Sequence, residues 1–329
     1  MKNTFLMLLG LLLLLTGCNR APAESGQAAA PKPAVTVTVK AQTAAPTDLP
    51  LVEVTPVPTG SERMDQEPIL GYCINILDRL PFRADLDGDG AAETVDLTTL
   101  PGAADGCPRW TVSVQKGDNV KLFETDVLSD MPCDLWAGDL DEDGRYELFF
   151  HGDLASDDYI IYAWRHDLAP IPFEPDDRFL RWNEQEGESS VFAGYIEGFE
   201  DGHIIVSGAV DMLGTHWGVR TLAMGDDGVI GPVSSAWEFE EDDERFLSVK
   251  RELPAFEARV RKDPGDAFTL QPGEKLYPLA SDGCERMWFK TDDGKTGVLL
   301  LVPDEDPLIQ WRIDGTPEAD YFEFLPYSG

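Results

Sequence analysis

The sequence predicts a mainly β protein, and two observations carry that prediction. Short stretches of alternating or continuous apolar residues recur along the chain, which is the pattern of strands with a buried face. Aspartate–glycine pairs separate many of them, and such pairs favour the tight turns of β-hairpins. Because stretches with helical periodicity are few and short, we expect sheets to form the core. The strand-like stretches are Arg109–Val114, Tyr146–Phe149, Tyr159–Trp164, Val191–Ile196, His203–Ser207 and Val219–Met224. The turn pairs are Asp201-Gly202, Asp227-Gly228, Asp282-Gly283 and Asp293-Gly294.

Residues 1–17 have the features of an export signal. Lys2 supplies a positive charge, and Phe5–Leu15 is almost wholly apolar. This stretch has the length of a signal-peptide core and is too short to span a hydrocarbon layer of about 30 Å. It leads into Leu15-Thr16-Gly17-Cys18, which resembles the lipobox of bacterial lipoproteins. The resemblance implies cleavage before Cys18 and lipidation of its thiol, including palmitate; the alternative is an ordinary secretory signal with an incidental cysteine.

Lipidation of Cys18 implies a cellular location for the rest of the chain. Each buried methylene contributes about 0.8 kcal/mol, so two acyl chains hold a protein on a membrane far more firmly than one. We therefore expect an extracytoplasmic protein, lipid-anchored to the cell membrane, or to the outer membrane if the host has one. Residues 18–65 are rich in Pro, Ala and Thr, and we expect them to form a flexible tether.

The charge of the chain limits the classes of partner that it can bind. There are 61 acidic and 26 basic residues among 329, and the formal net charge is −35. Phosphate groups would be repelled, so we expect no nucleic acid as a partner. Divalent cations and basic partners are favoured instead.

Four cysteines follow Cys18, and they permit two disulfides in three connectivities. They are Cys73, Cys107, Cys133 and Cys284. Cys107 and Cys133 lie within one predicted repeat, so we favour that pair.

Two acidic loops carry the sharpest chemical signal. Each has carboxylates at loop positions 1, 3 and 5, glycine at 6 and glutamate at 9, and the second begins 54 residues after the first. Alternate carboxylates around a glycine turn can converge on one Ca²⁺, which takes about six to eight oxygen ligands. An EF-hand is disfavoured because position 12 of the second loop is Phe150 and because both loops continue as strand-like sequence.

The loops resemble the FG-GAP or VCBS repeats of extracellular β-propellers, in which such a loop precedes a strand. The resemblance assigns Ca²⁺ in the first loop to Asp85, Asp87, Asp89, the Ala91 carbonyl and Glu93. In the second loop it assigns Asp139, Asp141, Asp143, the Arg145 carbonyl and Glu147. Only two repeats are recognisable, so we expect a partial or degenerate propeller-like core over residues 66–255. The alternative is a pair of acidic turns that bind no metal.

The last part of the chain carries a second resemblance. Pro272-Gly273-Glu274 and Asp293-Gly294-Lys295-Thr296-Gly297 look like the turns of a bacterial Src-homology-3-like domain. This implies a small β-barrel over residues 256–329 that binds a cell-wall peptide or a protein partner. The groove tryptophan of that family is replaced by Val298, which leaves Tyr277 and Trp288 as candidate ligand contacts; Trp288 as a packing residue is the alternative. Lys250–Lys262 is charged, and we expect a short helix there.

No catalytic motif is recognisable. The four histidines lack His-Glu-x-x-His spacing, and no Gly-x-Ser-x-Gly occurs. The leading hypothesis is a non-catalytic, lipid-anchored, calcium-stabilised cell-surface protein that binds an envelope or extracellular glycan or peptide. One alternative is an envelope hydrolase that acts on glycans through a carboxylate pair the sequence does not locate. Another is an assembly factor that binds a protein partner through the C-terminal barrel.

Overall fold

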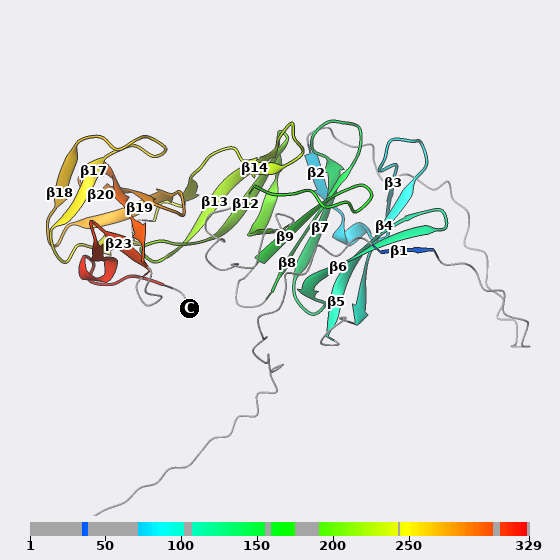
Figure 1. The fold of residues 1–329 in the computed structure, drawn as a ribbon, viewed down its shortest axis with the longest axis horizontal. Coiled ribbons are helices and arrows are strands. Elements are labelled where there is room, and N and C mark those ends of the chain that lie inside the picture. Colours follow the sequence, from blue (N-terminus) through cyan, green and yellow to red (C-terminus); the bar gives the residue numbers. More distant parts are fainter. Residues whose placement is uncertain are drawn as a thin grey trace, which may run out of the picture. The chain divides into compact units, whose positions relative to one another are not determined.

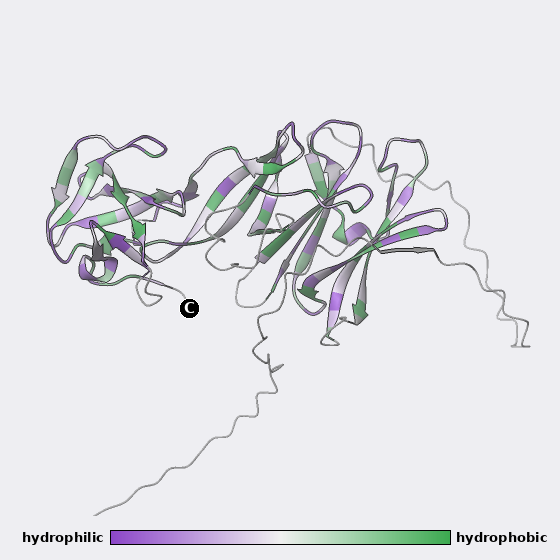
Figure 2. Cartoon of the chain, viewed as in Figure 1, coloured by the Kyte–Doolittle hydropathy of each residue, from purple (hydrophilic) through white to green (hydrophobic). Residues whose placement is uncertain are grey.

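Strands dominate the structure, a computed structural model that describes residues 35–38, 72–101, 107–154, 159–174, 191–242, 244–304 and 310–327 (Figure 1). Strands and bridges account for 58% of these residues and helix for 3%. The prediction of a mainly β protein is therefore confirmed. Hydrophobic residues gather in the strands (Figure 2), as sheets with buried faces require.

The N-terminal part of the described chain forms two five-stranded antiparallel sheets. In each, one edge strand is far in the sequence from the strand that it pairs with. The first sheet has the order β1-β6-β5-β4-β3, from β1 (Val35–Thr38), β3 (Phe82–Ala84), β4 (Glu93–Pro101), β5 (Pro108–Lys116) and β6 (Asn119–Leu128). The second has the order β10-β9-β8-β7-β2, from β2 (Tyr72–Asn75), β7 (Cys133–Asp139), β8 (Glu147–Asp153), β9 (Tyr159–Arg165) and β10 (Val191–Ala193).

An eleven-stranded antiparallel sheet follows, with the order β11-β12-β13-β15-β19-β20-β21-β17-β18 and with β14 on β13 and β16 on β19. Its strands are β11 (Tyr195–Glu200), β12 (His203–Asp211), β13 (Thr215–Met224), β14 (Ile230–Pro232), β15 (Trp237–Phe239), β16 (Leu247–Ser248), β17 (Leu253–Glu257), β18 (Ala267–Leu270), β19 (Lys275–Ser281), β20 (Arg286–Thr291) and β21 (Thr296–Leu300). A small sheet joins β22 (Val302–Pro303), β23 (Trp311–Ile313) and β24 (Thr316–Pro317). The helical turns are η1 (Leu77–Arg79) and η2 (Glu318–Asp320).

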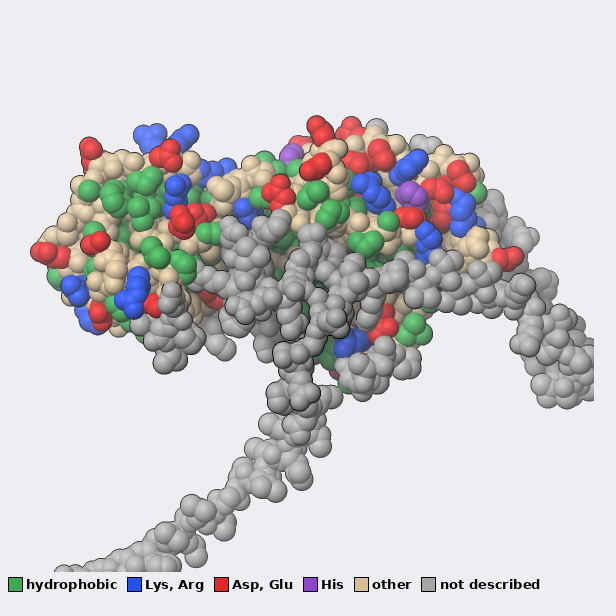
Figure 3. All heavy atoms as spheres, in the orientation of Figure 1, with side chains coloured by type: hydrophobic (Ala, Val, Ile, Leu, Met, Phe, Trp, Pro, Cys, Tyr) green, Lys and Arg blue, Asp and Glu red, His purple; other side chains and the backbone are tan. Residues whose placement is uncertain are grey.

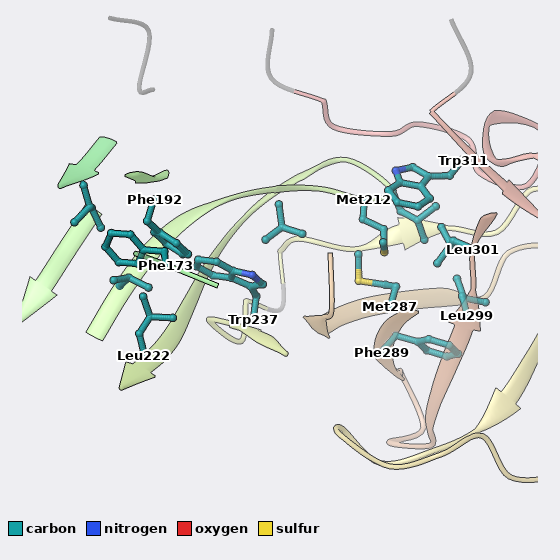
Figure 4. Close-up of a cluster of buried hydrophobic side chains, with 14 of the residues drawn as sticks. Phe173, Phe192, Met212, Leu222, Trp237, Met287, Phe289, Leu299, Leu301 and Trp311 are labelled. Atoms are coloured by element: carbon teal, nitrogen blue, oxygen red, sulfur yellow. The ribbon is translucent and has the colours of Figure 1, made fainter. Parts of the chain in front are cut away.

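The described residues form two large hydrophobic clusters. One lies under the first two sheets and includes Phe82, Phe150 and Trp164. The other extends from the second sheet into the eleven-stranded sheet, and Phe192 of β10 stacks on Trp237 of β15 within it, with ring centroids 6.3 Å apart (Figure 4). Acidic side chains are spread over the face shown in Figure 3.

The predicted strands and turns are confirmed. All six strand-like stretches lie in or overlap β5 and β8 to β13. The four aspartate–glycine pairs join β11 to β12, β13 to β14, β19 to β20 and β20 to β21. Each turn glycine has a positive φ, which is the backbone geometry that the pairs favour.

The helix predicted within Lys250–Lys262 is wrong. Residues Leu253–Glu257 form β17, which pairs with β18 and β21. Leu253 and Ala255 are buried while the residues between and after them are more exposed, so the segment follows the two-residue period of a strand. The boundary predicted between residues 255 and 256 falls inside this strand. No sheet of the described residues closes into a barrel, so the C-terminal barrel stays a prediction.

Part of the predicted tether is ordered. Val35–Thr38 pairs with β6 as an edge strand, and its alternating valines and threonines are good strand formers. Cys18, the leader and the other residues of 18–65 lie outside the described residues. Within the described ranges, no helix is long and apolar enough to cross a membrane.

The predicted Cys107–Cys133 disulfide is not formed in this structure. The four described cysteines form no disulfide with one another. Cys107 directly precedes β5 of the first sheet, whereas Cys133 begins β7 of the second. Burial raises the pKa of Cys133 to about 12, so its thiol is protonated at neutral pH.

Candidate metal centre

The two acidic loops occupy equivalent places in the first two sheets. The first acidic loop, residues 85–93, connects β3 to β4, and the second, residues 139–147, connects β7 to β8. In both, the final glutamate is the first residue of a strand. Since no helix follows either loop, the EF-hand alternative is excluded. Phe150, at position 12 of the second loop, is fully buried.

The loops also share most of their internal hydrogen bonds, displaced by 54 residues. One bond differs: the N–H of Asp89 donates to Asp85 Oδ1 at 3.0 Å, whereas the equivalent Asp139 Oδ1 has no hydrogen-bond partner. The backbone N–H of Leu86 donates to Glu93 Oε2 at 2.8 Å, and that of Leu140 donates to Glu147 Oε2 at 2.8 Å. The N–H of the glycine at position 6 donates to Oδ2 of the first aspartate, at 2.8 Å in the first loop and 3.0 Å in the second. These bonds fix the carboxylates at both ends of each loop.

The two loops lie side by side. The N–H of Tyr146 donates to the Leu86 carbonyl at 2.8 Å. At position 4, Gly88 has a φ of 74° and its equivalent Glu142 has a φ of 60°. A Cβ on Gly88 would lie 3.1 Å from the Gly144 carbonyl oxygen, so the contact between the loops leaves little room for a side chain there.

Three carboxylates converge in each loop, with oxygens within 4.8 Å of one another. They are Asp85, Asp87 and Glu93 in the first loop and Asp139, Asp141 and Glu147 in the second. The structure thus brings together three of the four predicted carboxylate ligands in each. Asp89 and Asp143 stand outside these groups, and their Oδ1 atoms accept from the N–H groups of Ala91 and Arg145 at 2.9 Å. The Ala91 and Arg145 carbonyls stay predicted ligands.

A lysine neutralises the first acidic loop. Lys116 Nζ lies 2.6 Å from Asp87 Oδ2, 2.7 Å from Asp89 Oδ2 and 2.7 Å from Glu93 Oε1. Hydrogen bonds to these carboxylates raise the pKa of Lys116 and lower that of Asp89. An ammonium group therefore occupies one side of the first cluster.

The second acidic loop has no such partner. Within the described residues, no lysine or arginine nitrogen lies within 4.0 Å of its carboxylates. Asp139 and Glu147 are buried, with exposed fractions of 0% and 1%, and Asp139 Oδ1 has no hydrogen-bond partner. Burial raises the pKa of Asp139 and raises that of Glu147 to about 8. The second loop thus has two buried carboxylates, Asp139 and Glu147, and the exposed Asp141, with no cationic side chain within 4.0 Å of them among the described residues.

The strand register is equivalent in the two sheets, so the difference arises from the direction of the basic side chain. Gln115 pairs with Thr94, so the next residue, Lys116, comes beside Glu93. In the second sheet Arg165 pairs directly with Glu147. Its guanidinium extends instead toward the turn after β13, where Nη2 lies 2.7 Å from the place of a Cβ on Gly228. Sequence reasoning missed Lys116 because it lies 23 residues beyond Glu93, outside any local motif.

The two predicted aromatic contacts in the last part of the chain differ in outcome. Trp288 is buried at 2% exposure against Ala236, Ala280 and Val298, so the alternative of a packing residue is confirmed. Tyr277 is half-buried, and its hydroxyl donates to Asp292 Oδ1 at 2.6 Å. Only Tyr277 stays a candidate ligand contact.

Comparisons with protein-family models, with curated proteins and with solved structures find no match for this chain. The interpretation of the acidic loops rests on their own geometry.

Proposed function

We propose that this chain is a lipid-anchored, calcium-stabilised cell-surface protein that binds an envelope or extracellular glycan or peptide without catalysing a reaction. The second acidic loop is the observation that carries the calcium part of this proposal. Its two buried carboxylates and the unpartnered Asp139 Oδ1 form a site that needs a positive charge. A buried, unpaired carboxylate costs several kcal/mol unless it is protonated or paired, so a cation would be strongly favoured.

The donor set fits Ca²⁺. All the groups that converge are carboxylate oxygens, which hard cations prefer, and no thiol or imidazole is among them. A bound Ca²⁺ would supply positive charge, while the N–H groups of Leu140 and Gly144 hold Glu147 and Asp139 in place for it. Because Asp139 ends β7 and Glu147 begins β8, this link would fasten the two ends of the hairpin together.

The repeated geometry supports the finer fold in this proposal. Two loops with the same hydrogen bonds and the same place before a strand are what FG-GAP or VCBS-like repeats would present. We therefore propose a degenerate propeller-like core. The Src-homology-3-like turns of the C-terminal part support a second, smaller binding unit.

Thermal unfolding of the full chain in detergent tests the calcium part. With about 1 mM Ca²⁺, in the affinity range of extracellular calcium modules, we expect a clearly higher Tm than with EDTA. Asp141→Ala should remove most of this difference, because Asp141 belongs to the second cluster and is exposed enough to be replaced without a cavity. An unchanged Tm with EDTA would sink the calcium proposal.

A further inference from the structure

Three aromatic side chains form a continuous, partly exposed strip, which we name the aromatic strip: Tyr195 on β11, Tyr159 on β9 and Trp217 on β13. Ring centroids are 5.3 Å apart for Tyr195 and Tyr159 and 6.4 Å apart for Tyr159 and Trp217. Trp217 is 41% exposed, and both tyrosines are half-buried. A contiguous aromatic surface that faces solvent is characteristic of a binding site.

The strand that carries Trp217 turns two apolar side chains toward solvent. Along β13, Trp217 and Val219 point outward at 41% and 42% exposure, whereas His216 and Arg220 are buried at 7% and 9%. Leu222 is buried on the same face as these two polar residues, so the inner face of β13 mixes polar and apolar side chains.

Two carboxylates flank the aromatic strip at Tyr195. Asp134 Oδ2 lies 3.2 Å from Nε2 of His151, whose ring centroid is 4.3 Å from that of Tyr195. Glu197 is exposed on β11, two residues from Tyr195, and its Oε1 accepts from Ser207 Oγ at 2.6 Å. Burial, Asp134 and Glu197 together raise the pKa of Tyr195, as expected if both negative charges act on its hydroxyl.

These groups restrict the chemistry of a ligand. Aromatic faces stack on the apolar faces of pyranose rings and attract ammonium groups. The carboxylates accept hydrogen bonds from hydroxyl and ammonium groups, and they repel phosphate and carboxylate. The net charge of −35 acts in the same direction.

We propose that the aromatic strip binds a glycan of amino sugars whose amines are free. Such a ligand satisfies both parts of the surface, with its rings stacked on Trp217 and Tyr159 and an ammonium group beside the exposed Glu197. Asp134, whose oxygens already accept from Asn75 and lie beside His151, adds negative charge nearby. This inference rests on the proposed function, because it names the site and the ligand class of the binding activity proposed above.

The test is titration calorimetry of the full chain in detergent, at about 0.15 M salt so that long-range attraction is screened. The probes are a β-1,4-linked glucosamine tetramer, its fully N-acetylated form, and a tetramer of galacturonic acid. We expect the glucosamine tetramer to bind at least about tenfold more tightly than the acetylated form, and the acidic tetramer not to bind. Equal affinity for the two forms, or binding of the acidic tetramer, would overturn the inference.

Matched variants separate stacking from charge. Trp217→Ala should weaken binding of the glucosamine tetramer at least about tenfold, because an exposed ring of a binding site carries much of the energy. Glu197→Gln should reduce the preference for free amines while the acetylated form binds as before. Phe246→Ala is the control, since Phe246 is 39% exposed and lies outside the aromatic strip.

The failures of the two proposals are distinguishable. A chain that is stabilised by Ca²⁺ but binds neither tetramer overturns the inference about the aromatic strip alone. A chain that binds the glucosamine tetramer through Trp217 but melts identically with and without Ca²⁺ overturns the calcium part of the proposed function and leaves the aromatic strip intact.

Discussion

The two acidic loops have carboxylates at the same positions, but only the first has a basic side chain beside them. The first places Lys116 Nζ within 2.7 Å of three carboxylates. The second buries Asp139 and Glu147 and sends Arg165, at the corresponding place in the sheet, toward Gly228. A shared motif therefore does not imply shared occupancy. We infer that the second loop depends on a cation from solution, whereas the first has a cation of its own.

The largest expected effect is that of Asp139→Asn, which keeps the shape of the side chain and removes its charge. At Ca²⁺ about 100-fold above Kd, a single site contributes about 2.7 kcal/mol to the free energy of unfolding. We expect the variant to lose this contribution. With EDTA it should be at least as stable as wild type, because a buried carboxylate without a partner has been removed.

Thermal melts with Ca²⁺ and with EDTA measure both effects. Asp85→Asn, at the equivalent position of the first loop, is the matched control, and its calcium response should remain close to that of wild type. If Asp85→Asn abolished the response and Asp139→Asn did not, the assignment of the two loops would be reversed.

The second prediction concerns Glu147 and pH. Its pKa is raised by burial to about 8 from an ordinary value near 4.5, so the folded state binds more protons than the unfolded state between these values. With EDTA, stability should therefore fall as pH rises from about 4.5 to about 8, by up to about 1.4 kcal/mol per pH unit for one proton. Ca²⁺ should flatten this slope, because it favours the charged carboxylate.

Chemical denaturation across this pH range checks the slope, and Glu147→Gln should remove its calcium-sensitive part. Glu318 is also buried, and its pKa is raised to about 7. Since Glu318 lies outside the acidic loops, Glu318→Gln should lower the slope equally with and without Ca²⁺. A slope that Ca²⁺ leaves unchanged in wild type would contradict the prediction.

Lys116→Met tests whether the first loop becomes a second metal site when its ammonium group is removed. Methionine retains the aliphatic part of the side chain, so the change is mainly one of charge. Calorimetry should count one Ca²⁺ per wild-type chain and two per variant chain. One Ca²⁺ in both proteins would show that the first cluster is not a site even without its lysine.

The smallest effect is expected at position 4 of the loops. Gly88→Ala should destabilise the fold by about 1 kcal/mol, because φ is positive there and a Cβ would lie 3.1 Å from the Gly144 carbonyl oxygen. Glu142→Gly, at the equivalent position, should be neutral or stabilising by up to about 1 kcal/mol, since it relieves a positive φ of 60°. Urea denaturation resolves both differences, and equal effects at the two positions would contradict the comparison.

Local patterns made much of this structure predictable. The acidic loops, the aspartate–glycine turns and the main strands are encoded by residues close together in the chain. The positions of the Lys116 and Arg165 side chains relative to the two loops were not predictable. Strand register and side-chain direction decide where the charged nitrogens of each residue lie. Trp217 was one of eight tryptophans, and the polar neighbours that β13 buries gave no sign that its ring would face outward. The helix expected near Pro254 is wrong because the segment alternates between buried and more exposed residues, with Leu253 and Ala255 buried, which is the period of a strand.

The pairing of β1 with β6 has a mechanical consequence. If Cys18 carries the lipid, only 16 residues lie between the anchor and Val35. Fully extended, they reach about 60 Å, so the first sheet cannot stand farther than that from the bilayer surface. A pull on the lipid would load the hydrogen bonds between β1 and β6 before it reached Tyr72. The pairing of β1 with β6 would therefore bear the load first and would shorten the effective length of the tether.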